Sequence, residues 1–204
     1  MRMIRSAALS AALLLAAGSA ADVEAQDWWF GFTWGASLPV SDTKDFADKS
    51  PSWRNFGIEG RKSLGDHTSL GFALGWNVFN ETSFETTELD NTQISGTQFR
   101  YINAFPLLIT GHYYIGERLD YKSGIRGFVG AGVGAYVAEN RVDIGFSSFK
   151  NTTWHFGVAP EAGVAYKFGS PFAMFLSAKY NLTTKADDRS LSYWNFNVGM
   201  VWSN

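Results

Sequence analysis

Three histidines and no cysteine limit the nucleophilic chemistry open to this chain of 204 residues. Without a thiol there is no cysteine nucleophile, no disulfide framework and no thiolate zinc site. A serine nucleophile needs a histidine and an acid beside it. His155 has both residue types in the chain shortly before it, at Asp143, Ser147 and Ser148. This loose arrangement has no compact catalytic spacing, and we expect no enzyme.

A glycine-rich stretch at residues 127–134 has the residue types of a phosphate-binding loop. After Gly127, its glycines at 130, 132 and 134 recur at every second residue, and no helical pattern follows. A dinucleotide-binding loop instead joins a strand to a helix. The spacing therefore predicts a strand whose glycines allow close approach of neighbouring side chains, and no cofactor is expected.

An acidic segment with no basic residue carries Glu81, Glu85, Glu88 and Asp90. Carboxylates are the ligands that divalent cations prefer, but this spacing matches no compact calcium loop. We interpret the segment as a solvated surface and expect no metal site.

The charge balance excludes one broad class of partner. Lys plus Arg number 17 and Asp plus Glu number 19, for a net charge of -2, and 46% of the residues are hydrophobic. Nucleic-acid binders carry a basic excess, and disordered chains lack this much apolar surface. We therefore expect a folded protein that does not bind nucleic acid.

The first segment has the three-part plan of a secretory signal peptide. Arg2 and Arg5 precede an apolar run at residues 7–17, and small residues follow. The run is too short to span a bilayer, which takes about 20 residues. Cleavage is possible after Ala21 or Ala25, and we favour Ala25. The predicted organisation is a signal peptide at residues 1–25 and one domain at residues 26–204.

Eight segments of that domain alternate between large apolar and small or polar residues, the period-two pattern of strands. They cover residues 28–38, 55–61, 69–78, 99–115, 125–137, 154–168, 172–182 and 194–202. Short connections at 63–67, 116–121 and 169–171 alternate with long polar ones at 41–52, 80–97, 139–152 and 183–192. This layout predicts an all-β fold, an eight-stranded antiparallel up-and-down transmembrane β-barrel.

The size of the residues decides which face of these strands points inward. An eight-stranded barrel encloses just enough room for side chains to fill it. One face carries bulky rings such as Trp34, Trp76 and Trp154, and the other is rich in Gly, Ala, Ser and Asn. A soluble lipocalin-type barrel would need a charged outer face. We therefore expect the aromatic face to contact lipid, with Trp28 and Trp202 near strand ends at the water–lipid boundary.

Charged residues on the inward face form a candidate lumen cluster. Buried charges are tolerated when they are paired, so we expect Glu59 and Glu161 to accept hydrogen bonds from the cations. A gated ion path is the alternative interpretation. The predicted cluster consists of Glu59, Arg61, Arg100, Arg126, Glu161, Lys167 and Lys179.

The last predicted strand carries the most specific motif. A polar residue, a glycine and an aromatic residue stand at Asn197, Gly199 and Trp202, while Asn204 departs from a final Phe. With this strand, the segment at residues 101–108 and the glycine-rich strand, the chain resembles the OmpA-like and OmpX-like eight-stranded outer-membrane β-barrels. The resemblance covers residues 27–204. It implies that these three residues are an insertion signal, read by the barrel-insertion machinery.

The resemblance also implies a location and a set of partners. The location is the bacterial outer membrane with both termini periplasmic, among membrane lipids and lipopolysaccharide. Basic residues in the long connections are candidates for contact with lipopolysaccharide phosphates. They are Lys44, Lys49, Arg141, Lys150, Lys185 and Arg189.

Three functions remain open from the sequence. The first is a non-enzymatic structural or cell-surface role through four long extracellular loops. The second is a small OmpW-like channel or carrier for hydrophobic solutes. The third is a lipid A-modifying enzyme.

Overall fold

The computed structural model describes residues 28–46, 50–89, 92–117, 123–144, 147–168, 171–186 and 189–203. The predicted signal peptide, residues 1–25, lies outside the described residues. The elements, in chain order, are β1 (Trp28–Val40), α2 (Asp42–Phe46), β2 (Ser52–Ser63), β3 (Thr68–Leu89), β4 (Thr92–Ile115), β5 (Ser123–Ile144), β6 (Ser147–Phe168), β7 (Phe172–Thr183) and β8 (Ser192–Ser203). Within these residues, no helix is long and apolar enough to cross a membrane.

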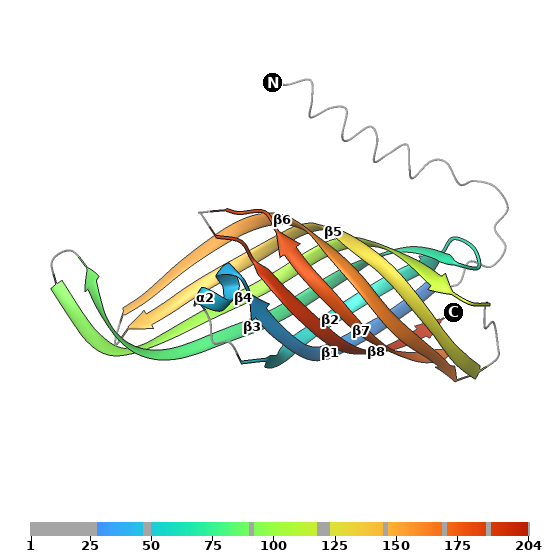
Figure 1. Cartoon of the computed structure of the whole chain (residues 1–204), viewed down its shortest axis with the longest axis horizontal. Helices are drawn as coiled ribbons and strands as arrows, with labels where there is room; N and C mark the ends of the chain where they lie inside the picture. The colour runs from blue at the N-terminus through green and yellow to red at the C-terminus, as the bar shows by residue number, and fades with distance from the viewer. Residues whose placement is uncertain are drawn as a thin grey trace, which may run out of the picture.

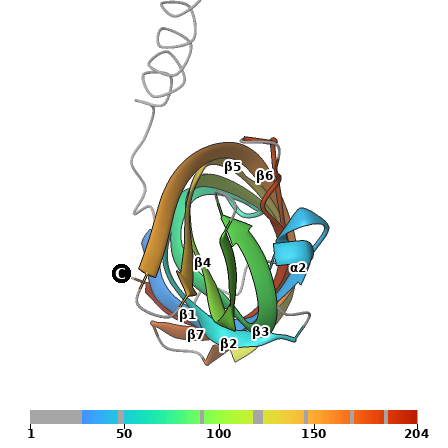
Figure 2. The ribbon, with the colours of Figure 1, turned by 90° about the vertical axis from the view of Figure 1, so that its left-hand side faces the viewer.

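The strands close into a barrel (Figures 1 and 2). Each strand pairs antiparallel with the next, and β8 pairs with β1 along twelve positions from Trp29↔Ser203 to Val40↔Ser192. Closure leaves no edge strand inside the bilayer, where an unpaired backbone group would be costly. The predicted all-β, eight-stranded antiparallel up-and-down barrel is confirmed.

The barrel has two different ends. We call the end with the β2–β3, β4–β5 and β6–β7 connections the short-turn end, and the opposite one the long-loop end. The prediction of long loops was wrong at two of its four places, residues 80–97 and 139–152, because most of these residues lie in strands. β3 and β4 pair as far as Leu89↔Thr92, and β5 and β6 as far as Ile144↔Ser147. Outside lipid a hairpin meets water on both faces, so its sequence need not alternate.

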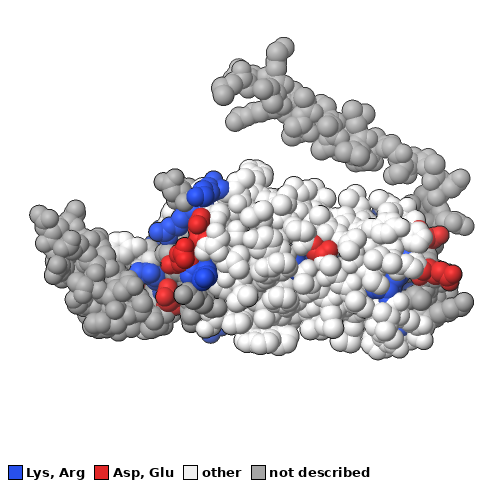
Figure 3. Space-filling model, viewed as in Figure 1, with Lys and Arg blue, Asp and Glu red and all other residues white. Residues whose placement is uncertain are grey.

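The outer face of the barrel is apolar, the reverse of a soluble protein. Phe32, Ile109 and Phe156 expose 61%, 63% and 71% of their surface. In Figure 3, acidic and basic residues gather toward the two ends, and the surface between them is almost entirely uncharged. As predicted from the residue sizes, the bulky face points outward, where only lipid can cover it.

Tryptophans border this apolar band. Trp28 and Trp202 lie on the outer face at the short-turn end. Trp53, Trp154 and Trp194 lie on the outer face toward the long-loop end. Indole rings favour the boundary between lipid and water, so the two groups mark the two membrane surfaces.

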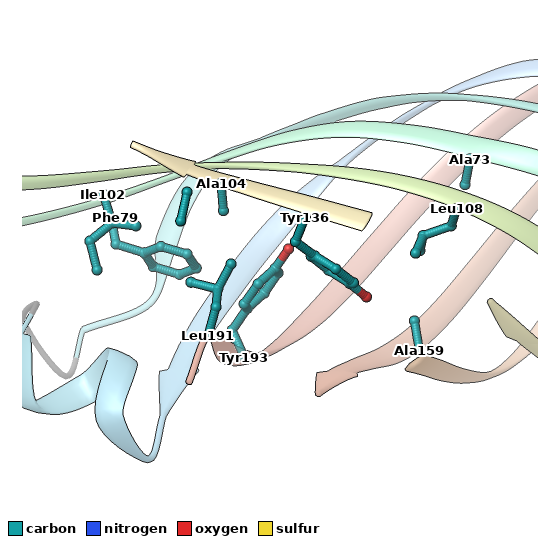
Figure 4. Packing of buried hydrophobic residues seen from close by; sticks show 10 residues of the cluster. Ala73, Phe79, Ile102, Ala104, Leu108, Tyr136, Ala159, Leu191 and Tyr193 are labelled. Carbon is teal, nitrogen blue, oxygen red and sulfur yellow. The ribbon is translucent and has the colours of Figure 1, made fainter. Parts of the chain in front are cut away.

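The lumen is less uniformly small than the sequence suggested. Toward the long-loop end, the rings of Phe79, Tyr136 and Tyr193 converge from β3, β5 and β8 (Figure 4). Toward the short-turn end, Phe128 and Phe175 pack with Tyr114 and Trp29. These two aromatic groups narrow both ends of the lumen.

Glycines on neighbouring strands make room for these rings. A Cβ at Gly199 would overlap the ring of Phe175, and a Cβ at Gly163 would overlap the ring of Phe128. A ring can therefore point inward wherever the adjacent strand carries no side chain.

The rim at the long-loop end is tied together by α2. The carboxylate of Asp42 accepts hydrogen bonds from the backbone N–H and the hydroxyl of Ser190, at 2.8 and 2.9 Å. These bonds hold the pKa of Asp42 below its usual value. The hydroxyl of Thr43 accepts a hydrogen bond from the backbone N–H of Ser192 at 2.7 Å. The β1–β2 and β7–β8 connections are thus joined.

The glycine-rich strand β5 offers a test of this packing. We expect Gly134→Ala to lower the free energy of unfolding by about 1–3 kcal/mol, as overpacking does. Its Cβ would collide with the backbone carbonyl of Leu107, which cannot move away. Gly127→Ala is the matched control, because the nearest atoms, on Ile115, lie at 3.8 and 4.0 Å from the new Cβ. Urea unfolding in lipid vesicles, followed by tryptophan fluorescence, measures both, and equal midpoints would contradict the packing argument.

Candidate functional site

Four charged side chains meet in the middle of the lumen, and we call them the ion cluster: Glu59, Arg61, Glu161 and Lys179. Arg61 Nη2 lies 2.7 Å from Glu59 Oε2. Lys179 Nζ lies 3.1 Å from Glu59 Oε1 and 3.4 Å from Glu161 Oε2. Arg61 Nη2 completes the ring at 4.0 Å from Glu161 Oε1. Two positive and two negative charges thus neutralise one another away from water.

Strand register brings these four residues together. Glu161 and Lys179 are directly opposite each other on β6 and β7. Glu59 and Arg61 are two residues apart on β2, so both point inward. The cluster therefore joins β2 to β6 and β7 through the lumen. All four side chains are at least nine-tenths buried.

His112 on β4 is a fifth member, which the sequence analysis did not include. Its Nε2 lies 3.2 Å from Glu161 Oε2, and the ring is buried. Gly130 on the neighbouring strand leaves space for the imidazole. The sequence did indicate that His112 points inward, because it lies an even number of residues from Arg100 and Thr110, which are on the inward face of the same strand.

Aromatic rings seal the cluster toward the short-turn end. The guanidinium carbon of Arg61 lies 5.0 Å from the ring centre of Phe128 and 5.1 Å from that of Phe175. Arg61 Nη1 also donates to the hydroxyl of Tyr114 at 3.2 Å. The positive charge of Arg61 is therefore stabilised by cation–π contacts and a hydrogen bond from the aromatic group at the short-turn end, as well as by the carboxylates.

Buried asparagines cover the cluster toward the long-loop end, and we call them the amide layer: Asn55, Asn77, Asn181, Asn195 and Asn197. Asn55 donates to Asn197 at 2.7 Å, and Asn195 donates to Asn77 at 2.9 Å. The side-chain oxygen of Asn181 accepts a hydrogen bond from the hydroxyl of Tyr136 on β5 at 3.0 Å. Amides both donate and accept, so such a layer satisfies itself without water.

Little free volume remains in this part of the lumen. A cavity of about 20 Å³ lies between Glu59, Lys179 and the amide layer. That volume holds about one water molecule. Within the described residues, the arrangement therefore favours a filled lumen over a continuous ion path.

The structure does not bring the other three predicted members to the cluster. Arg100 lies toward the long-loop end, 4.0 Å from the carboxylate of Glu81. Arg126 lies at the short-turn end, where it donates to the carbonyl of Gly116 and covers the ring of Tyr114. Lys167 is half-buried near the same end of β6. Alternation predicts the side of a strand on which a residue lies, but not its height in the lumen.

The predicted insertion signal occupies three different environments on β8. Asn197 belongs to the amide layer, Gly199 lies against Phe175, and Trp202 is exposed on the outer face. Two of the three residues thus have packing roles in the lumen. Their recognition by the insertion machinery stays a prediction.

The residues considered for catalysis do not form a triad. The Nδ1–H of His155 donates to the carbonyl of Thr184 at 3.0 Å, with the ring buried in the lumen mouth. Asp143 instead accepts from Arg141 at 2.9 Å, near the tip of the β5–β6 hairpin and opposite Ser148. The side chain of Ser147 is not described. Nor do the described residues contain any group of three or more His, Asp or Glu side chains that could hold a metal ion.

Comparisons with known proteins agree with this architecture. The model of the outer membrane protein beta-barrel domain matches residues 7–203. The N-terminal β-barrel domain of Pseudomonas aeruginosa OprF is similar, with a TM-score of 0.51 and 13% identity over 87% of this chain and 97% of that chain. The Yersinia pestis attachment invasion locus protein Ail has a TM-score of 0.50 and 12% identity, over 87% and 99%. No curated protein sequence matches significantly. The structural likenesses show the fold alone.

Removing one member of the ion cluster should be costly. We expect Lys179→Met to lower the free energy of unfolding by about 3–5 kcal/mol, because two buried carboxylates then face too few cations. Lys150→Met is the matched control, since this lysine pairs with Glu139 at the exposed rim and its loss should cost at most about 1 kcal/mol. Urea unfolding in lipid vesicles compares the two. If Lys179→Met costs no more than Lys150→Met, the cluster does not stabilise the barrel.

Proposed function

The chain belongs to the outer membrane protein beta-barrel family, and we propose that it is a non-conducting barrel that works at the bacterial cell surface rather than as a channel or an enzyme. The filled lumen carries this proposal. An ion cluster with balanced charges, an amide layer and two aromatic groups occupy it from end to end. Function then falls to the parts of the chain outside the bilayer.

We also propose an orientation in the membrane, which the two unequal ends of the barrel support. We assign the short-turn end and both termini to the periplasm, and the long-loop end to the cell exterior. Barrels of this class have short periplasmic turns and longer extracellular connections. In this orientation β8 presents Trp202 to lipid, as a strand read by the barrel-insertion machinery would.

Basic residues at the long-loop end are suited to lipopolysaccharide. Lys44 lies in α2, and Arg141, Lys150, Lys185 and Arg189 lie at or near the rim. Lys49 lies outside the described residues. Ammonium and guanidinium groups form charge-assisted hydrogen bonds with phosphates, so we propose contact with the phosphates of surrounding lipopolysaccharide.

The extended β3–β4 hairpin provides the second surface feature. β2 pairs with β3 only as far as Asn55↔Asn77, whereas β3 continues to Leu89. Among the described residues, no strand covers the outer edge of β3 beyond this point. Exposed strand edges accept an added strand from a partner, so this hairpin is suited to binding a protein segment in extended conformation.

A second candidate function is that of a channel or carrier. Measurements of ionic current across planar bilayers distinguish it from the non-conducting barrel. We expect the full chain to give no unitary current steps in planar bilayers, because the lumen leaves room for about one water near the ion cluster. A general porin in the same bilayers serves as the positive control. Heat-modifiable migration on gels verifies that the barrel is folded. Reproducible steps from folded protein would refute the non-conducting proposal.

The orientation has its own test on intact cells. An epitope tag inserted between residues 90 and 91 should bind antibody on intact bacteria, because the proposed orientation puts the β3–β4 connection outside the cell. The same tag inserted between residues 119 and 120 should bind only after the outer membrane is permeabilised. Flow cytometry measures both. The reverse pattern would overturn the proposed orientation and leave the conductance result unaffected.

A further inference from the structure

An apolar groove crosses the outer face of the barrel, and we call it the side groove. Its volume is about 650 Å³, which is within the range of small-molecule sites. It runs across β8, β1, β2 and β3, and one end reaches Met174 on β7. The groove opens toward the membrane and is separate from the ion cluster, which lies inside the lumen.

Strand register builds this groove. Its two walls are rows of large outward residues that are paired directly across β1, β2 and β3. The row nearer the long-loop end is Trp34, Phe56 and Trp76, and the row nearer the short-turn end is Phe32, Ile58 and Leu74. Between the rows, Gly57 and Gly75 are opposite each other and have no side chain. The floor of the groove is therefore strand backbone.

The wall nearer the long-loop end is held in place by ring contacts. The rings of Phe56 and Trp76 have their centres 6.4 Å apart, and those of Trp34 and Trp53 are 6.1 Å apart. Rings that pack against each other on paired strands have little freedom left to lose. A ligand that binds along such a wall therefore pays a small entropic cost.

The groove slopes along the barrel because the strands are staggered. Gly35, next to Trp34, belongs to a row of directly paired residues that runs around the barrel. Through β2 to β5 this row reaches Thr153 of β6, nearer the long-loop end. Through β8 and β7 it reaches Gly163 of the same strand, nearer the short-turn end. The side groove therefore descends from β3 toward β8.

A guanidinium lies beside the long-loop wall of the groove. Arg54 is exposed and comes two residues before Phe56 on β2, so both side chains are on the outer face, about 7 Å apart at Cα. Its backbone N–H donates to Ser52, but within the described residues its guanidinium has no ion pair or hydrogen bond. The neighbouring indole of Trp53 is also exposed and favours the boundary between lipid and water. Arg54 is therefore available to an anion at the depth of the lipid headgroups.

We propose that Arg54 and the side groove together hold one lipopolysaccharide molecule, with a lipid A phosphate on the guanidinium and an acyl chain in the groove. A guanidinium binds a phosphate through two parallel charge-assisted hydrogen bonds. A chain that starts near Arg54 and follows the groove from β3 toward β8 runs into the bilayer, as an acyl chain must.

This site deepens the proposed surface function, because Arg54 is not among the rim cations assigned to lipopolysaccharide above. It rests on the proposed orientation, which places Arg54 in the outer leaflet, where lipopolysaccharide is the phosphate-bearing lipid. The other apolar residues of the barrel surface contact exchanging lipid. The side groove differs from them in joining a deep apolar channel to an unpaired cation.

The test uses the full chain in nanodiscs of phosphatidylcholine that contain a small fraction of lipid A. Native mass spectrometry of the released barrel counts the lipid that stays bound. We expect one lipid A per barrel, although phosphatidylcholine is in excess. A synthetic lipid A without phosphates should be retained about tenfold less, the loss of one charge-assisted hydrogen-bonded pair.

Variants separate the two halves of the site. Arg54→Gln should reduce the retention of lipid A to that of the phosphate-free form and leave the phosphate-free form unaffected. Lys62→Gln is the matched control, because Lys62 lies on the same face of β2 at the short-turn end, with its ammonium over the ring of Trp28. Heat-modifiable migration verifies that each variant is folded.

The groove has its own pair of variants. Ile58→Trp should lower the retention of both lipids, because the larger side chain occupies the groove. Ile109→Trp should leave both unchanged, since Ile109 is exposed on the outer face of β4 and does not line the groove. Neither substitution alters the lumen.

Three results would overturn the proposal. They are equal retention of lipid A and its phosphate-free form, an equal loss in Lys62→Gln and Arg54→Gln, and equal retention in Ile58→Trp and Ile109→Trp. Both leaflets of the nanodisc are alike, so none of these results depends on the orientation in the cell. A reversed epitope pattern would instead refute the orientation, and with it the choice of lipopolysaccharide, without changing the nanodisc measurements.

Discussion

The narrow interior of an eight-stranded barrel is the constraint on which the rest of this structure depends. A barrel of this size has room for side chains and little else. Any charge that points inward must find its counter-charge in the same small volume, because water does not reach it. Lys179 therefore lies between Glu59 and Glu161, and Arg61 lies beside the same two carboxylates and against two aromatic rings. The outcome is a lumen filled and electrically neutral at its middle.

Filling this interior requires that large and small residues alternate between strands as well as along them. Phe175 occupies the space left by Gly199, Phe128 the space left by Gly163, and His112 the space left by Gly130. The lipid-facing side has no such limit, since acyl chains adapt to any surface. The same strands are thus closely complementary on the inside and merely apolar on the outside.

A sealed middle separates the membrane-spanning part of the molecule from its surface. The long-loop end keeps what the lumen lacks: exposed charge and a strand edge beyond Asn77. α2 joins two of the connections at this rim through Asp42 and Thr43. The rim is therefore a shaped and charged surface held on a rigid support, an arrangement common to proteins that bind through loops.

The sequence alone determined the number and order of the strands, their lipid-facing side and the inward side of residues such as Glu59 and Lys179. Period-two alternation shows which residues share one face of a strand. The face with the bulkier residues does not fit inside an eight-stranded lumen, so it must point outward. The sequence could not determine how far along the barrel axis each inward residue lies, because that position depends on the stagger between neighbouring strands in the closed barrel. Only the folded barrel showed that His112 joins the ion cluster and that Arg100, Arg126 and Lys167 do not. Residues 80–97 and 139–152 also required the structure, because a hairpin in water pairs through its backbone whether or not its side chains alternate.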